Sequence, residues 1–432
     1  MSGPLIDDPR AALAAIFEAA VAAAHPRQCL VPHLPAPPSQ GRLVVLAAGK
    51  AGASMAAVAD AFYREHHGAN EVNLVGLAVT RHGYAEPAGL IPVIEAGHPV
   101  PDRNGVAATE RALALAEAAG ENDLVLVLLS GGGSANWIAP AGTLTLDEKQ
   151  SITRALLRSG ANIGEINTVR KHLSRIKGGR LARIAAPARV LTLAISDVPH
   201  DDPAVIASGP TVPDPSTLAD AHAVIARRGI PLPASARALL DDPANETPKP
   251  GAPLFERTEF RIVSRPADAI AAAADRARQA GYEPVVLGAN LEGEARDVAV
   301  DHARMALDLA AAGRRAAVIS GGELTVTVRG QGRGGPNQEY ALALALALEG
   351  APGIAALAAD TDGTDGGGGA ASDPAGARID ESTLARAEKL GLDASACLND
   401  NDSTKFFRRL GDLVTPGPTL TNVNDCRILL IR

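Results

Sequence analysis

The sequence runs through Leu124-Val125-Leu126-Val127-Leu128-Leu129 and then turns directly into Ser130-Gly131-Gly132-Gly133-Ser134. Six apolar residues without polar alternation are typical of a strand that is buried on both faces, as in a parallel sheet. The three glycines tolerate positive φ angles and keep side chains away, so that backbone N–H groups can face an anion. The plainer interpretation is a tight connection that needs only the conformational freedom of glycine. We favour a ligand-binding turn, because ligands of open α/β sheets bind beyond the carboxyl ends of strands.

Similar strand patterns recur along the chain, each closed by a polar or glycine-rich turn, at Leu43–Ala48, Val190–Ile195, Pro284–Leu287, Ala316–Ile319 and Ile354–Ala359. Helical patterns occur at Pro9–Ala24, Ala107–Ala119, Leu146–Arg158, Ala267–Gln279, Glu294–Ala312 and, as a buried helix, Ala341–Leu348. Fully apolar strands that alternate with helices predict an α/β fold with parallel sheets covered on both faces. The alternating run Leu324–Arg329 follows Gly321-Gly322 and predicts an antiparallel hairpin strand, and hence a mixed sheet in the second half of the chain.

The length of 432 residues indicates more than one domain. The clearest boundary is the segment 241–257, in which closely spaced prolines exclude a regular element. The sequence therefore predicts an N-terminal domain at residues 1–240, a linker at 241–257 and a smaller C-terminal domain at 258–432.

The composition excludes several classes of protein. A net charge of −8 argues against a nucleic-acid or anionic-membrane partner. The three cysteines show neither metal-ligand spacing nor a disulfide framework, which favours a reducing compartment. The Ala-rich N-terminal segment lacks the basic start of a signal peptide, since Asp7 and Asp8 precede it, and no apolar run approaches the roughly 18 residues of a membrane span. We therefore expect a soluble, cytoplasmic protein.

Two further strand ends carry chemistry in the N-terminal half. Gly49-Lys50-Ala51 follows the first strand, where the Lys50 ammonium could meet a phosphate or carboxylate, although a surface lysine explains it equally. The segment is not a Walker A loop, because its spacing differs. Asp197 follows the strand Val190–Ile195, where a carboxylate could bind Mg²⁺ or accept a proton. Helix capping is the alternative for the acids of this loop and explains Asp201 or Asp202 well.

A basic segment and a histidine are further candidates. The segment from Asn167 to Arg180 is predicted to be a helix on which Lys171 and Arg175 share a face and could meet an anion, although a solvated charged face is the more common reason for such a run. His98 follows a short strand and could reach a ligand, or be a structural histidine.

In the C-terminal half, Arg333 lies in a glycine-rich loop and could clamp a carboxylate or phosphate with its planar guanidinium. Asp362 belongs to the acidic, glycine-rich segment 360–369, which ends another strand. This segment is not an EF-hand, because Ala371 stands where that loop needs glutamate. Its glycines could equally form the hinge of a lid.

Taken in order, these segments resemble the class II glycerate 2-kinases, a two-domain family whose C-terminal half is the MOFRL domain. The motifs that carry the resemblance span nearly the whole chain and are Gly49–Ala51, Ala96–Asp102, Ser130–Ala135, Asn167–Lys171, Ser196–Val198, Ala207–Thr211, Leu291–Ala295, Ser320–Glu323, Gly334–Glu339, Thr361–Gly363 and Gly417–Asp425. The chain departs from the family at Pro336, where an arginine is common, and at Ala289-Asn290, where an aspartate is often found.

The resemblance implies transfer of the γ-phosphoryl group of ATP to the 2-hydroxyl of D-glycerate, with Mg²⁺, giving 2-phosphoglycerate. It implies a Rossmann-like N-terminal domain and an active site in the cleft between the two domains. Lys50 matches the family's essential lysine, Asp197 is the candidate for the metal or the proton, and Arg333 is the candidate to replace the missing arginine. The residues expected to bind substrate or nucleotide are Gly49, Ala51, His98, Ser130, Gly131, Gly132, Gly133, Ser134, Lys171, Gly322, Glu323, Asn337 and Asp362.

Two other functions stay open at this point. One is an NAD(P)H-dependent hydroxypyruvate reductase, a name that proteins of this family have also carried. Such a reductase should carry the fingerprint Gly-x-Gly-x-x-Gly. Gly131 and Gly133 match its first two glycines, but Asn136 stands in place of the third, which argues against this function. The other is a non-catalytic sensor of sugar acids, which would need neither Lys50 nor Asp197. The oligomeric state is open, with a homodimer as one alternative.

Overall fold

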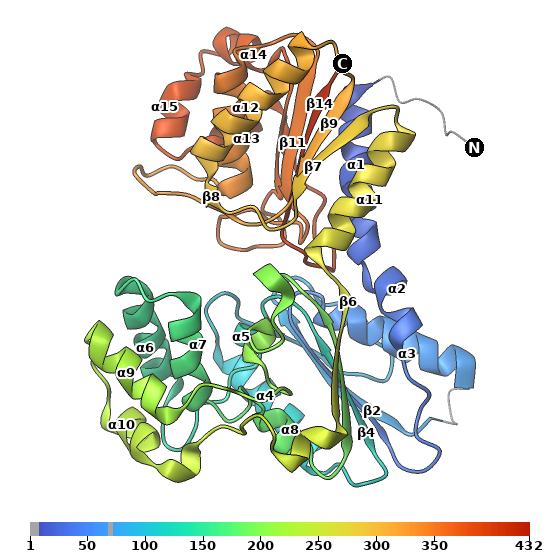
Figure 1. Cartoon of the computed structure of the whole chain (residues 1–432), viewed down its shortest axis with the longest axis vertical. Coiled ribbons are helices and arrows are strands. Elements are labelled where there is room, and N and C mark those ends of the chain that lie inside the picture. Colours follow the sequence, from blue (N-terminus) through green and yellow to red (C-terminus); the bar gives the residue numbers. More distant parts are fainter. Residues whose placement is uncertain (1–7, 68–71) are drawn as a thin grey trace. The chain divides into compact units, whose positions relative to one another are not determined.

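The computed structural model describes residues 8–67 and 72–432, which form two compact units. One unit comprises residues 29–263 and holds a parallel sheet. The other joins the described part of residues 1–28 to residues 264–432 and holds a mixed sheet. We call them the parallel-sheet unit and the mixed-sheet unit (Figure 1).

The sheet of the parallel-sheet unit has the strand order β3-β2-β1-β4-β5-β6. Its strands are β1 (Leu43–Ala48), β2 (Leu74–Arg81), β3 (Val93–Ala96), β4 (Leu124–Leu129), β5 (Arg189–Ile195) and β6 (Thr258–Ser264). β1 pairs in parallel with both β2 and β4, β2 with β3, and β4 with β5. The chain runs outward from β1 to β3 and then returns to the other side of β1. This is the Rossmann order, and its direction reverses between β1 and β4.

Helices pack around this sheet and extend beyond it. They are α3 (Gly52–His67), α4 (Arg103–Glu117), α5 (Gly133–Asn136), α6 (Leu146–Arg158), α7 (Ile163–His172), α8 (Arg180–Ala185), α9 (Leu218–Arg228) and α10 (Ala234–Asp241), while the short α2 (Pro26–Cys29) lies at the unit boundary. Figure 1 shows α6, α7, α9 and α10 gathered in one group beside the sheet. This group has a small core of its own, which includes Leu156, Val169, Leu173 and Leu240.

The sheet of the mixed-sheet unit has the order β13-β12-β11-β14-β9-β7. The strands are β7 (Glu283–Gly288), β9 (Ala316–Ser320), β11 (Ile354–Asp360), β12 (Gly376–Ile379), β13 (Leu413–Val414) and β14 (Asp425–Ile431). β7 and β9 run in parallel, and the other neighbours are antiparallel. The α/β fold with a parallel sheet followed by a mixed sheet is therefore confirmed.

Helices cover both faces of the mixed sheet (Figure 1). One face carries α1 (Pro9–Ala24) and α11 (Pro266–Gln279), and the other carries α12 (Ala295–Ala311) and α13 (Pro336–Leu348). The peripheral helices are α14 (Thr383–Lys389), α15 (Ala394–Asn399) and α16 (Ser403–Leu410). The predicted buried helix at Ala341–Leu348 is confirmed as part of α13, nearly all of whose side chains are buried.

The division of the chain differs from the predicted boundaries at both ends of the N-terminal domain. α1 packs on α11 and on the mixed sheet, because its apolar residues Leu13, Ile16 and Phe17 are buried there. The segment 241–257 belongs to the parallel-sheet unit rather than standing apart as a linker. Its side chains bind that unit: the Asn245 amide donates to the backbone oxygen of His172 (2.8 Å), and the Thr247 hydroxyl donates to Asp214 (3.0 Å).

Two secondary-structure predictions are wrong. The run Leu324–Arg329 contains only the short strand β10 (Leu324–Thr325), which pairs in parallel with β8 (Gly293–Glu294) outside the main sheet. Side chains replace strand pairing beyond it: Glu294 accepts from the backbone and the hydroxyl of Thr327 (both 3.0 Å). The basic segment is not one helix either, because α7 ends at His172 and Gly178 and Gly179 adopt φ angles of 60° and 77° before α8 begins.

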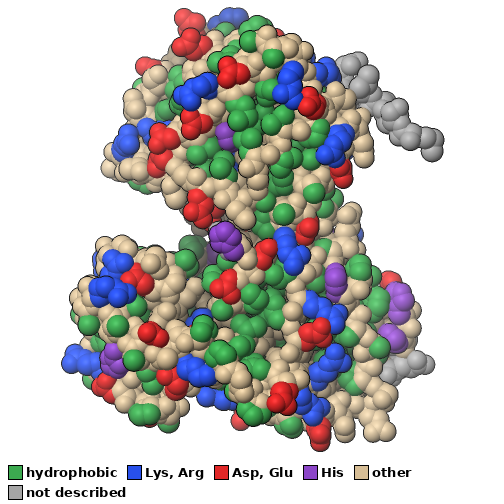
Figure 2. All heavy atoms as spheres, viewed as in Figure 1, with side chains coloured by type: hydrophobic (Ala, Val, Ile, Leu, Met, Phe, Trp, Pro, Cys, Tyr) green, Lys and Arg blue, Asp and Glu red, His purple; other side chains and the backbone are tan. Residues whose placement is uncertain are grey.

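No helix within the described residues is long and apolar enough to cross a membrane. On the face drawn in Figure 2, basic and acidic side chains are interspersed over both units. This mixture agrees with the modest negative net charge of the whole chain.

Candidate active site

The turns after β1 and β4 are locked together at the switch point of the parallel sheet. The N–H of Lys50 donates to the oxygen of Gly131 (2.8 Å), and the N–H of Ala51 donates to the hydroxyl of Ser130 (2.9 Å). Gly49 has a φ of 120°, and a Cβ there would overlap the Ser130 side chain and backbone. Only glycine fits such a close approach, so the two turns form one rigid surface at the edge of the sheet.

Lys50 and His98 flank the glycine turn. Gly132 has a φ of 83°, and a Cβ on it would lie 2.9 Å from Cδ2 of His98 and 3.3 Å from Cγ of Lys50. Both side chains are half-buried. Within residues 8–67 and 72–432, the N–H groups of Gly131 and Gly132 donate no hydrogen bond. The structure thus brings together two N–H donors, a lysine and a histidine, which suits a phosphate or carboxylate.

A fully buried lysine supports this turn from below. Nζ of Lys177 donates to the backbone oxygen and the hydroxyl of Ser134 (2.7 and 3.2 Å) and to the oxygen of Trp137 (3.0 Å). Burial, with the nearby Arg170 charge, holds the pKa of Lys177 well below its usual range. Sequence reasoning did not single out Lys177, although its place directly before Gly178-Gly179 separates it from the helical lysines.

Lys171, predicted as a ligand-binding residue, has a different partner. It is buried and forms an ion pair with Asp214 (3.2 Å). Arg175, predicted to share its face, lies on the surface and pairs with Glu110 (2.6 Å). The shared anion-binding face is therefore wrong, because the chain leaves α7 before Arg175.

Asp197 comes two residues after β5 and is half-buried. Because β5 pairs with β4, Asp197 lies at the same edge of the sheet as Ser130. Asp202 caps the next turn by accepting from the N–H of Ala204 (2.9 Å), as the capping interpretation predicted. Among the residues that the structure describes, no three His, Cys, Asp or Glu side chains are arranged to hold a metal ion. A single carboxylate still fits Mg²⁺, which binds to one or two carboxylates together with substrate phosphates.

In the mixed-sheet unit, the turns after β9 and β11 and the start of β14 lie at one edge. Ser320 stands opposite Arg427, and Asp360 opposite Asp425. Arg427 is fully buried and donates to Ser320 (3.2 Å), to Asp425 (2.8 Å) and to the backbone oxygen of Gly321. The predicted residue Gly322 follows with a φ of 93°, and Glu323 after it is exposed.

The start of α13 meets this edge through Asn337. Its amide donates to Asp425 (2.6 Å) and to Asp365 (3.2 Å). The carboxylate of Asp365 also accepts from the N–H groups of Asn337 (3.0 Å) and Gln338 (2.9 Å). Burial, reinforced by the charge of Asp425, raises the pKa of Asp365 to about 7. Asp365 was seen in the sequence only as one acid of a glycine-rich loop.

The two remaining predicted residues lie on neighbouring loops. Asp362 is buried and accepts from the N–H (2.7 Å) and hydroxyl (3.0 Å) of Thr364, which shapes its own turn. Arg333 is exposed, and its backbone is tied to Asp402 (3.2 Å) and Thr404 (2.9 Å). In the described part of the chain, its guanidinium has neither a hydrogen bond nor an ion pair.

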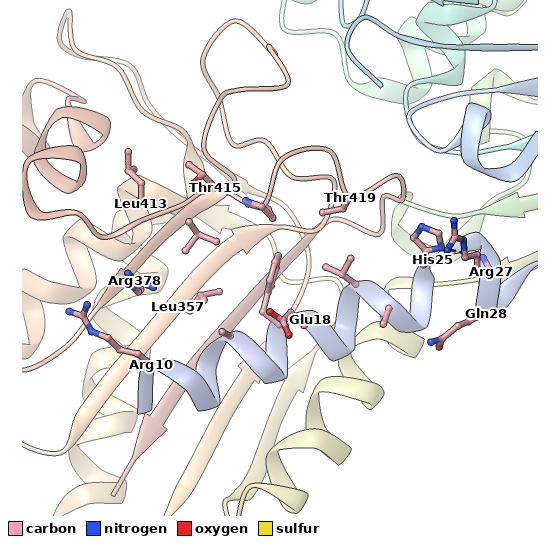
Figure 3. Close-up of a pocket in the computed structure, with 16 residues that line it drawn as sticks. Arg10, Glu18, His25, Arg27, Gln28, Leu357, Arg378, Leu413, Thr415 and Thr419 are labelled. Atoms are coloured by element: carbon pink, nitrogen blue, oxygen red, sulfur yellow. Dashed lines mark hydrogen bonds between the residues drawn. The ribbon is translucent and has the colours of Figure 1, made fainter. Parts of the chain in front are cut away.

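A groove of about 690 Å³ lies elsewhere in the mixed-sheet unit, along α1 (Figure 3). Arg10, Glu18 and His25 line it from the N-terminal segment, and Leu357, Arg378 and Thr419 line it from the sheet and its loops. None of the predicted site residues lines this groove. The strand-end turns are therefore the better candidates for chemistry.

Two family models match long regions of the chain. Residues 12–241 match the family described as "Domain of unknown function (DUF4147)", and residues 316–425 match the MOFRL family. The chain belongs to the MOFRL/DUF4147 glycerate kinase family. The first matched region contains β1 to β5 of the parallel sheet, and the second contains β9, β11, β12 and β13 of the mixed sheet.

Its relatives carry two different names. A protein of Agrobacterium vitis named "Putative hydroxypyruvate reductase" is 51% identical over 428 residues, which cover 98% of this chain and 94% of the relative. The D-glycerate 2-kinase of Thermotoga maritima is 41% identical over 396 residues, which cover 90% and 91%. The crystal structure of a glycerate kinase from Thermotoga maritima matches with a TM-score of 0.85 at 39% identity, covering 97% of this chain and 99% of that chain. The chain is thus an enzyme of the glycerate kinase family.

The raised pKa of Asp365 predicts a pH-dependent stability. Its folded pKa of about 7 exceeds the unfolded value, so the folded state holds the proton more tightly between about pH 4 and pH 7. The free energy of unfolding should therefore fall as pH rises through this window, by up to about 4 kcal/mol from this group. In Asp365→Asn this contribution should be absent. Urea unfolding of both proteins across the window measures it, and a difference between them that does not change with pH would contradict the assignment.

Proposed function

We propose that this member of the glycerate kinase family transfers the γ-phosphoryl group of ATP to the 2-hydroxyl of D-glycerate, giving 2-phosphoglycerate and ADP. The observation that carries the proposal is the meeting of Lys50 and His98 around Gly132 at the switch point of the parallel sheet. Phosphoryl transfer depends on positioning and charge neutralisation rather than on a covalent nucleophile. The relative named D-glycerate 2-kinase supplies the substrate and the position of the hydroxyl.

In this proposal the phosphates of ATP lie on the turn Ser130–Ser134. The N–H groups of Gly131 and Gly132 bind phosphate oxygens, and the Lys50 ammonium neutralises their charge. Gly49, Ala51 and Ser130 hold the two turns in register through the hydrogen bonds between them. His98 borders the same surface and can donate a further hydrogen bond.

The reaction forms a bond between the 2-hydroxyl oxygen of glycerate and the γ-phosphorus while the bond from that phosphorus to ADP breaks. The hydroxyl proton must leave, and we assign its acceptance to Asp197, which lies at the same edge of the sheet as Ser130. Asp197 is also the residue that would hold Mg²⁺, which neutralises phosphate charge when bound. These two roles of Asp197 remain alternatives.

The carboxylate of glycerate needs a cation, and we assign it to Arg333 in the mixed-sheet unit. Pro336 occupies the first turn of α13, where its missing N–H costs nothing, but it cannot supply the charge of the arginine common in the family. Arg333 lies on the loop just before it, and its guanidinium fits a carboxylate with two parallel hydrogen bonds. Gly322, Glu323, Asn337 and Asp362 belong to the same group of turns and are proposed to shape the site. The expected position of the site in a cleft between two domains stays a prediction.

The second candidate is an NAD(P)H-dependent hydroxypyruvate reductase. The Rossmann strand order and the name of the Agrobacterium vitis relative favour it. Against it, the turn after β1 has Ala51 and Ser54 where the dinucleotide fingerprint has its second and third glycines. The kinase explains the turn better, because Lys50 supplies a cation beside the glycine turn while Ala51 and Ser54 replace the two glycines.

One experiment separates the two activities. The enzyme is incubated with D-glycerate, ATP and Mg²⁺, and the product is identified by phosphorus NMR; in parallel, hydroxypyruvate is supplied with NADH or NADPH. We expect 2-phosphoglycerate and ADP in the first reaction and no oxidation of the dinucleotide in the second. Formation of 3-phosphoglycerate would show that the phosphoryl group is transferred to the 3-hydroxyl instead of the 2-hydroxyl. Dinucleotide oxidation without any phosphoglycerate would overturn the kinase.

Replacing Lys50 tests the turn itself. Lys50→Ala should lower kcat at least about a thousandfold, because the developing phosphate charge loses its cation. The matched control is Lys389→Ala, an exposed lysine in the mixed-sheet unit, which should keep the wild-type rate. Circular dichroism and thermal unfolding check that both variants fold. A Lys50→Ala rate near that of the wild type would remove Lys50 from the site and would also favour a non-catalytic role for this turn.

Arg333 has a matched control on its own loop. Arg333→Ala should raise the KM for D-glycerate at least about tenfold while leaving the KM for ATP within about twofold, because only the carboxylate contact is lost. Arg329→Ala removes another exposed arginine of the same loop and should change neither constant. If both variants behave alike, Arg333 does not hold the carboxylate.

A further inference from the structure

A pocket of about 280 Å³ lies in the parallel-sheet unit, among α6, α7 and the segment that follows His98. Its walls combine prolines and aliphatic residues with a few polar side chains. They are Pro99, Val100, Pro101, Ile138, Leu146, Lys149, Gln150, Thr153, Arg154, Leu157, Ile163, Ile166 and Arg170. The volume is slightly below the range of about 300–1,000 Å³ found for small-molecule sites, so it suits one ring system rather than a whole nucleotide.

Exposed hydrophobic side chains gather at this pocket. Nine large hydrophobic side chains are exposed among the described residues, and three of them, Val100, Leu157 and Ile163, line this one pocket. Each of the three is at least 60% exposed. Apolar side chains that gather around a concavity, instead of scattering singly, indicate a binding surface.

The pocket adjoins the glycine turn on two sides. Pro99 follows His98, whose ring borders Gly132. On the other side, the Arg170 guanidinium lines the pocket and donates to the backbone oxygen of Ser134 (3.4 Å), the last residue of the turn. A ligand whose phosphates lie on the turn would therefore reach the pocket with its other end.

The polar groups of the pocket are donors or neutral. The walls contain Arg154, Arg170 and the buried Lys149, and none of the described residues that line the pocket is acidic. Gln150 is held in place by its hydrogen bond to the oxygen of Pro101 (2.7 Å). A purine ring has apolar faces and ring nitrogens that accept hydrogen bonds, and guanidinium groups stack on such rings. The chemistry of the walls matches a purine better than it matches a cationic or a sugar-like group.

We propose that this pocket binds the adenine ring of ATP, with its phosphates on the turn Ser130–Ser134. The proposal rests on the kinase function and adds the part of the site that recognises the base. It assigns to α6 and α7 a role in nucleotide selection, and it divides the nucleotide between two neighbouring features of one unit.

The test compares a ligand that has the base with one that has only the phosphates. Isothermal titration calorimetry measures the Kd of ADP and of inorganic tripolyphosphate, both with Mg²⁺, for the full-length wild type and for variants. Thr153→Trp fills the pocket from α6, and Leu157→Asn places an amide at its exposed rim, where folding is least affected. Leu90→Asn is the matched control, because Leu90 is similarly exposed in the same unit (55% against 61% for Leu157) and lies outside the pocket.

We expect Thr153→Trp to raise the Kd of ADP at least about tenfold and Leu157→Asn to raise it less. The Kd of tripolyphosphate should change by less than about twofold in both variants. Leu90→Asn should match the wild type. Unchanged ADP affinity in both pocket variants would overturn the proposal, as would an equal loss for both ligands.

The outcome for the pocket can be told apart from that for the function. If the wild type forms phosphoglycerate but the pocket variants bind ADP normally, the base pocket is wrong and the kinase stands. If the wild type binds neither ADP nor tripolyphosphate and forms no phosphoglycerate, both fail. Weakened NADPH binding in the pocket variants, with no ADP binding in the wild type, would assign the pocket to the reductase instead.

Discussion

The close contact between the turns after β1 and β4 is the constraint on which the parallel-sheet unit depends. These strands are neighbours in the sheet, although β1 ends at Ala48 and β4 begins only at Leu124. Gly49 lies so close to Ser130 that any side chain at position 49 would overlap it. Two hydrogen bonds between the turns fix their register. As a result, the backbone of Lys50 is held beside the glycine turn. The position of the candidate site follows from this backbone contact.

Both units support a glycine turn with a fully buried cation. Lys177 donates to Ser134 behind the turn of β4, and Arg427 donates to Gly321 behind the turn of β9. A buried charge is costly unless its hydrogen bonds are satisfied, and here backbone oxygens of the turn satisfy them. In each unit the buried cation therefore ties the backbone of the turn to the interior of its own unit.

Elements that local sequence patterns determine were predicted correctly from the sequence. Features that depend on contacts between distant parts of the chain were not. Leu43–Ala48 and Leu124–Leu129 match β1 and β4 residue for residue, because an apolar run closed by a glycine turn leaves little freedom. By contrast, Lys171 rather than Lys177 was predicted to bind the ligand, because the segment was interpreted as one continuous helix and the break at Gly178-Gly179 was overlooked. The central strand β14 was missed because the buried Arg427 interrupts its apolar pattern. The place of α1 on the mixed sheet depends on contacts with residues from the far end of the chain, which no local pattern reveals.

The fold alone does not choose between a kinase and a reductase, because the Rossmann strand order serves both. The difference lies in the turn after β1. A dinucleotide fold needs glycine at its second position so that the pyrophosphate can approach the backbone. Here that position is Ala51, and its N–H is already bonded to Ser130. In the proposed kinase the phosphate-binding donors lie instead on the turn after β4, and Lys50 on the turn after β1 supplies the cation. Such an arrangement would neutralise a transferring phosphoryl group rather than cradle a static pyrophosphate.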